Sequence, residues 1–81
     1  MRKVVKVTPL KNYCILVEFE NGENRISDLK PLLEKKVFSI LKDESVFKQV
    51  YLEHGAVTWK DNNGNEIDIC PDKLYNSSLS I

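Results

Sequence analysis

Apolar and polar residues alternate through the first quarter of the chain. Segment 12–20 has the period-two pattern of a half-buried strand. The apolar face of this strand is formed by Tyr13, Ile15, Val17 and Phe19. Segment 3–9 alternates in the same way, with Val5 and Val7 on one face, and it ends at Pro9. We expect the two segments to pair antiparallel.

Asn21-Gly22 predicts the turn that follows. A two-residue hairpin loop requires positive φ at both positions, which Asn tolerates and Gly adopts freely. Such a loop places Val17 opposite Ile26 on the buried face and Glu18 opposite Arg25 on the exposed face. We therefore expect a third antiparallel strand after the turn.

The middle of the chain has a helical period. Ser27 or Asp28 can cap the start, and Pro31 falls in the first turn, where proline is tolerated. The apolar positions at helical spacing are Leu29, Leu32, Leu33, Val37, Ile40 and Leu41. Lys35-Lys36 interrupts this pattern and predicts a break between two short helical pieces. A capped single turn is expected over 43–47.

The last third returns to the strand pattern. Segments 50–54 and 56–60 flank a turn at His54-Gly55, and a polar loop over 60–66 leads into a final strand. The inward side chains expected here are Val50, Leu52, Val57, Trp59, Ile67 and Ile69. Pro71 suits the first turn of a short terminal helix.

This order of elements predicts the fold class and the domain limits. We expect an α+β fold, with a small antiparallel meander sheet of about five to six strands and short helices packed on one face. Residues 1–76 form a single domain, and 77–81 form a frayed tail. No internal repeat or linker interrupts the chain.

The net charge of the chain does not change the predicted fold and does not favour an anionic ligand. Twelve Lys and Arg balance twelve Asp and Glu among the 81 residues, so the chain has no overall field that would attract nucleic acid or anionic lipid. The densest basic group comprises Arg2, Lys3, Lys6 and Lys11. We interpret these residues as strand-face and terminal charges, and keep nucleic-acid binding as the alternative function.

Candidate catalytic and metal-binding residues are few. Cys14 and Cys70 are too far apart for a CxxC pair, and His54 is the single histidine. Loop 61–66 fits a calcium loop poorly, because its glycine comes early and strands flank it. We expect no catalytic, cofactor-binding or metal-binding residue. An enzyme using Cys14, His54 or the carboxylates Asp61, Glu66, Asp68 and Asp72 is the least favoured function.

Segment 1–20 lacks the apolar core of a signal peptide, and no run reaches membrane-spanning length. We therefore expect a cytoplasmic protein with reduced thiols that does not bind membranes.

Aromatic residues near the sheet edges are typical anchors of protein interfaces. The candidate interaction surface comprises Tyr51, Trp59, Asp68 and Tyr75. The alternative is that Trp59 and Tyr75 close the small core. Sheet edges with unpaired backbone groups also favour a protein partner or a homodimer formed through an edge strand.

Several stretches resemble one bacterial family. They are VTPLKNYCILVEFENGE, the DLxPLL pattern of 28–33, FxxL at 38–41, VTW at 57–59 and IDIxPDxLY at 67–75. In their order and spacing they resemble domain of unknown function 2442 (DUF2442). The resemblance implies a small α+β domain, which elsewhere precedes a helix-turn-helix domain. It also implies membership of two-gene modules with suspected toxin–antitoxin behaviour. No catalytic residues are implied, and the polar loop 60–66 is longer than is usual in the family.

Overall fold

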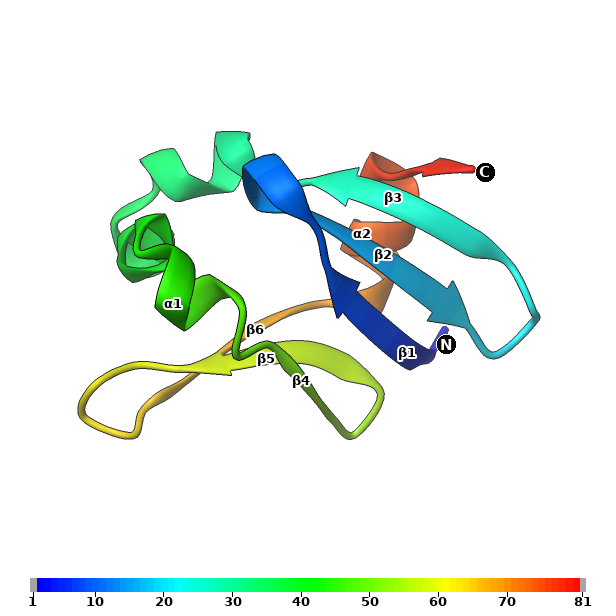
Figure 1. Cartoon of the computed structure of the whole chain (residues 1–81). Coiled ribbons are helices and arrows are strands. Elements are labelled where there is room, and N and C mark those ends of the chain that lie inside the picture. Colours follow the sequence, from blue (N-terminus) through cyan, green and yellow to red (C-terminus); the bar gives the residue numbers. More distant parts are fainter. Residues whose placement is uncertain (1, 81) are drawn as a thin grey trace.

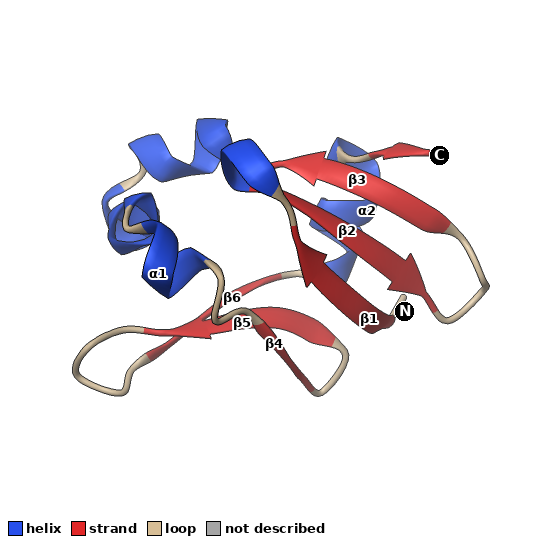
Figure 2. Ribbon diagram, in the orientation of Figure 1, coloured by secondary structure: helices blue, strands red, loops and turns tan. Residues whose placement is uncertain are grey.

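The fold consists of two antiparallel sheets with short helices in the computed structural model, which describes residues 2–80 (Figures 1 and 2). The first sheet has the order β1-β2-β3-β7, with bounds Val4–Pro9, Cys14–Phe19, Asn24–Asp28 and Leu79–Ser80. The second has the order β4-β5-β6, with bounds Tyr51–Glu53, Ala56–Lys60 and Glu66–Ile69. Five helical segments accompany them: η1 (Lys11–Tyr13), η2 (Lys30–Glu34), η3 (Lys36–Lys42), α1 (Glu44–Phe47) and α2 (Pro71–Ser77).

The α+β class and the antiparallel pairing of consecutive strands are confirmed, but the single meander is wrong. The chain leaves β3, passes through η2, η3 and α1, and begins a separate sheet at β4. A backbone hydrogen bond joins the two sheets, from Val4 N–H to the Gly55 carbonyl at 2.8 Å. Because both sheets have an apolar face, two sheets turned toward one core bury both faces better than one open sheet does.

The core lies between the sheets and α2. Its residues come from every part of the fold: Val4, Ile15, Val17, Phe19, Leu29, Leu33, Leu41, Phe47, Val57, Trp59, Ile69 and Leu74. The predicted inward face of β2 is confirmed, since Ile15, Val17 and Phe19 are all fully buried. Trp59 is the largest buried side chain, and its Nε1–H donates to the Phe47 carbonyl at 2.9 Å.

The register predicted for the first hairpin is wrong by one residue. Phe19 N–H donates to the Glu23 carbonyl, so the loop has three residues, 20–22, of which Gly22 alone has positive φ. The Asn21 side chain instead accepts the Glu23 N–H at 3.0 Å, which holds an Asx-type turn. Consequently Val17 pairs with Arg25, and Ile26 lies on the outer face with 38% of its surface exposed.

A bulge alters the predicted faces of β1. Val4 pairs with Phe19 and Lys6 with Glu18, so Val5 is an extra residue between two ladder positions. Val4 is therefore buried with Val7 partly inward, whereas Val5 is 51% exposed. The predicted pairing of Val5 with Val7 on one face is incorrect for this reason.

The helical connection is built as expected, from short pieces. Lys35 has extended backbone angles and separates η2 from η3, which confirms the predicted break. The Asp28 carboxylate accepts the Lys30 N–H at 2.9 Å. Asp43 caps α1 by accepting the Ser45 N–H at 3.0 Å. These carboxylates satisfy backbone donors at helix starts that have no partner within the helix.

The last residues, for which the sequence predicted a frayed tail over 77–81, contain the end of α2 and a short strand. α2 continues to Ser77, and Leu79–Ser80 pair with β3, while Ile81 lies outside the described residues. Arg25 holds this segment: its Nε–H donates to Ser78 Oγ at 2.8 Å and an Nη2–H to the Ser78 carbonyl at 3.0 Å. Arg25 was expected beside Glu18, and the shifted register is what turns it toward Ser78.

Candidate interaction surfaces

The first sheet leaves one of its faces open. In Figure 1, α2 lies behind β2 and β3, and no described segment crosses in front of them. The strand register aligns four side chains across this open face, one from each strand: Thr8, Leu16, Ile26 and Leu79. We call these four residues the outer row. Exposure rises along it toward the edge, from half-buried Leu16 to 38% at Ile26 and 76% at Leu79.

Polar residues flank the outer row on both sides. Lys6 lies opposite Glu18 on one side, and Asp28 forms an ion pair with Lys30 at 3.1 Å on the other. Each cation therefore has an anionic neighbour. Three of the four residues of the outer row are apolar, and polar residues border the row on both sides, which is the composition expected for the centre and rim of a protein interface.

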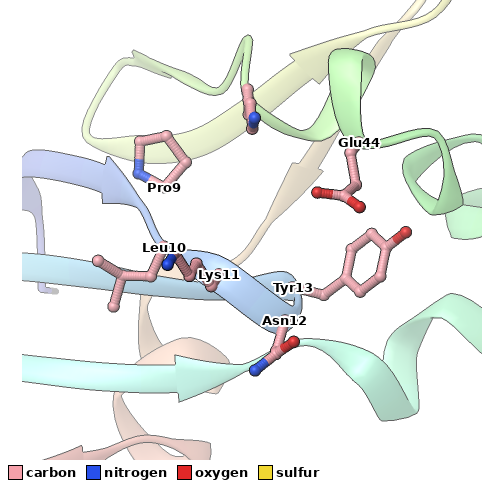
Figure 3. Close-up of a pocket in the computed structure, with 7 residues that line it drawn as sticks. Pro9, Leu10, Lys11, Asn12, Tyr13 and Glu44 are labelled. Carbon is pink, nitrogen blue, oxygen red and sulfur yellow. The ribbon is translucent and has the colours of Figure 1, made fainter.

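A groove opens beside the loop that joins β1 to β2. It has a volume of about 710 Å³ and is lined by loop residues 9–13 together with Glu44 and Lys48 (Figure 3). We call it the loop groove. The Glu44 side chain points from α1 toward the Tyr13 ring, so the groove lies between the first sheet and the helical layer. A groove of this volume is within the range of about 300–1,000 Å³ typical of ligand sites.

The wall of the loop groove contains strained backbone. Asn12 and Tyr13 both have φ of 60°, in the left-handed region that non-glycine residues seldom adopt. Surrounding contacts hold this conformation. Tyr13 Oη–H donates to the Lys42 carbonyl, the Tyr13 carbonyl accepts the Leu29 N–H at 2.9 Å, and the ring packs edge-on against Phe47 at 5.4 Å. Strain kept in this way often occurs where a surface is shaped for a ligand.

Tyr75 occupies a third position, where α2 meets β3. Its Oη–H donates to Glu23 at 2.6 Å, and its ring packs edge-on against Phe19 at 5.1 Å. The guanidinium groups of Arg2 and Arg25 lie 4.0 and 4.2 Å from the ring centroid. The hydrogen bond from Tyr75 lowers the pKa of the Glu23 carboxyl. Tyr75 therefore fastens α2 to the sheet, which is a structural role.

The four residues predicted as an interaction surface do not come together. Trp59 is fully buried, as the core interpretation required. Tyr51 and Asp68 lie on the outward side of the second sheet, both in line with Thr58. Tyr51 donates to Glu66 at 2.8 Å, and burial together with this bond raises the pKa of Tyr51 to about 12. Tyr75 belongs to α2 and packs against the first sheet at Phe19.

Sequence reasoning missed both the outer row and the loop groove. Leu16 lay on the face expected to be polar, and Ile26 was assigned to the core. The face of β2 that was expected to be polar includes Leu16, and this leucine could have indicated an apolar outer surface. The groove could not be found without knowing that α1 returns to the β1–β2 loop.

The other sequence candidates are dispersed. The His54 side chain is 92% exposed and lies within 3.3 Å of Glu53, while Cys14 Sγ contacts the Asn12 carbonyl at the far end of β2. Within residues 2–80, no three His, Cys, Asp or Glu side chains gather at one metal site. Asp61 accepts the backbone N–H groups of Asn63 and Asn65, each at 2.8 Å, and these bonds lower its pKa.

The predicted basic group does not form one patch. Arg2 pairs with Asp72, and the Lys3 side chain lies beside Gly55. Lys6 lies beside Glu18, whereas Lys11 lines the loop groove at the other end of β1. Among the described helices, none has the length and apolarity needed to cross a membrane.

Comparison with known proteins identifies a family. Searches of curated proteins and of solved structures gave no match. The family model described as "Protein of unknown function (DUF2442)" matches residues 4–80, which include both sheets and the segments that line both surfaces. This match confirms the resemblance found in the sequence, and the chain belongs to the DUF2442 family.

Proposed function

We propose that the protein is a small non-catalytic interaction module that binds another protein through the outer row. The observation that carries this proposal is the alignment of Leu16, Ile26 and Leu79 across three hydrogen-bonded strands on an uncovered sheet face. Apolar side chains in register on an open face provide a flat patch that a partner's apolar surface can cover.

The charges around the patch support a protein partner over nucleic acid. Lys6 lies opposite Glu18 in the strand register, and Lys30 forms an ion pair with Asp28, so each of these cations beside the row has a carboxylate nearby. Binding to a phosphate backbone depends on positive charge that neighbouring carboxylates do not offset. The chain as a whole is also neutral.

The accessible surface of the chain supports reversible binding over permanent assembly. Its accessible surface is 5,212 Å², close to the roughly 5,000 Å² expected for a folded monomer of 9.4 kDa. An obligate subunit would leave a larger uncovered core face. We therefore propose reversible binding. A regulatory or antitoxin-like role in a two-gene module is the setting that the family resemblance implies.

Paired variants test this proposal. The double substitution Ile26→Thr with Leu79→Ser removes the apolar row while leaving the strand backbone intact. Val37→Ser is the matched control, because Val37 is 66% exposed but lies in η3, away from the sheet face. Each protein is expressed in the source cells at native level and co-purified at low salt, with and without nuclease.

We expect a stoichiometric protein partner that is bound by the wild type and by the Val37 variant, and is lost from the double variant. Equal retention by all three proteins contradicts the proposal. Retention that disappears after nuclease treatment favours the nucleic-acid alternative. If light scattering shows that the wild type is a dimer and the double variant a monomer, the partner bound by the outer row is a second copy of the chain.

A further inference from the structure

The loop groove is rigid on its sheet side. Tyr13 is fixed at its hydroxyl, its carbonyl and its ring, and the Asn12 carbonyl accepts a bond from Lys30 Nζ at 3.0 Å. Leu10 N–H closes the loop onto the Cys14 carbonyl at 2.8 Å. A wall held in this way loses little conformational entropy when a ligand binds.

The charge of the loop groove is not balanced. Its lining includes two lysines, Lys11 and Lys48, and one glutamate, Glu44, which together carry a net charge of +1. Neither lysine forms an ion pair with another residue in the range 2–80, whereas Lys30 nearby is paired with Asp28. The groove therefore offers cations to an incoming anion on a chain whose total charge is zero.

Part of the lining is apolar. Pro9 and the 37% exposed Leu10 lie at one end of the groove, and the Tyr13 ring lies at the other end, beside Glu44 (Figure 3). A ligand that satisfies this surface needs a carboxylate next to an apolar side chain. A nucleic acid fits less well, because its repeated phosphates meet the Glu44 carboxylate and leave Leu10 uncovered.

We propose that the loop groove binds an extended acidic segment of a partner protein, with a carboxylate held by Lys11 and Lys48 and an apolar side chain against Pro9 and Leu10. This inference rests on the proposed role in protein binding and adds the chemistry of a second contact. The outer row supplies a flat apolar patch, and the loop groove selects a short acidic sequence.

Selection from a displayed library of random peptides tests this inference. Wild-type protein is compared with Lys11→Glu/Lys48→Glu and with the control Lys35→Glu/Lys36→Glu, which makes the same change of charge at exposed positions outside the groove. Folding of each variant is checked by circular dichroism. Selected peptides are then synthesised with Asp or Glu and with the matching Asn or Gln.

We expect enriched peptides with an acidic residue beside an apolar one. Their affinity should fall about tenfold in the groove variant, because two attractions become repulsions, and remain similar in the control. The inference is overturned if no peptide is enriched, if the amide versions bind equally, if both variants lose equal affinity, or if single-stranded DNA binds the groove more tightly than the peptides. The Ile26→Thr/Leu79→Ser protein should keep peptide binding, so failure here is separate from failure of the outer row.

Discussion

Ser27 illustrates how a single residue limits stability. Its side chain is 1% exposed on the inward face of β3, and its Oγ has no hydrogen-bond partner among the described residues. A buried hydroxyl without a partner costs desolvation energy that no bond offsets. We expect Ser27→Ala to raise the free energy of unfolding by about 1 kcal/mol, measured by urea denaturation.

Ser78→Ala provides the comparison for this prediction. Ser78 is also buried, but its Oγ accepts from Arg25 and donates to the Tyr75 carbonyl at 3.0 Å. Its loss should lower stability by about 1 kcal/mol or more, because Arg25 then loses an acceptor. Destabilisation by both substitutions would show that the Ser27 hydroxyl has a partner in solution.

The raised pKa of Tyr51 predicts a change in stability at alkaline pH. Its pKa is raised from 10 to about 12, first by burial and then by the hydrogen bond to Glu66. Because the folded-state pKa is above the unfolded value, the contribution to stability is complete below pH 10 and is lost as the pH rises toward 12. Spectrophotometric titration of tyrosinate should show a component near 12 that is absent in Tyr51→Phe. If that component persists in the variant, it belongs to another tyrosine.

At the scale of elements, the turns differ in how strictly they require glycine. Gly22, Gly55 and Gly64 all have positive φ, so alanine is strained at each. Only at Gly55 would an added Cβ also meet a neighbour, the Lys3 side chain at 3.0 Å. We expect Gly22→Ala and Gly64→Ala to cost about 1 kcal/mol each, and Gly55→Ala clearly more, by thermal or urea denaturation. Equal losses at all three would mean that Lys3 moves aside.

Sequence reasoning found the elements better than their registers. Alternation identified β2, which buries one face, and also β5, although Thr58 is buried on the face opposite Val57 and Trp59. Asp43 indicated the start of α1. The turn type predicted for the first hairpin was wrong at Asn21. The Asn21 side chain accepts the Glu23 N–H, and Asn21 does not adopt positive φ. The two-residue turn with positive φ at both positions occurs at His54-Gly55, between paired Glu53 and Ala56. Turn type depends on such side-chain bonds, which composition does not specify.

The surfaces were harder to predict than the elements, because they depend on register and on distant contacts. The observed register differs by one residue from the predicted one. Ile26 therefore lies on the outer face instead of in the core, and Arg25 points toward Ser78 instead of outward. The loop groove needs Glu44 and Lys48 to pack beside residues 9–13, more than 30 positions earlier in the chain. Local periodicity carries no information on such a contact.

At the scale of the whole molecule, the two sheets depend on each other. Val17 and Phe19 of the first sheet share one core with Val57 and Trp59 of the second, and Leu74 of α2 completes it. Both sheets contribute to this one core, so neither sheet buries its apolar face fully without the other. Separating the two sheets would expose the apolar face of each to water, which is unfavourable.

We therefore expect unfolding as a single cooperative unit. Trp59 is the single tryptophan, so its fluorescence reports on the core at the second sheet, while far-ultraviolet circular dichroism reports on all elements. The two urea transitions should coincide, because opening one sheet exposes the core face of the other. Trp59→Phe removes the bond to Phe47 and part of the packing, and should shift the circular-dichroism midpoint without splitting the transition. A fluorescence transition that precedes the dichroism transition would show instead that the second sheet opens first, and that the two sheets fold as separate units.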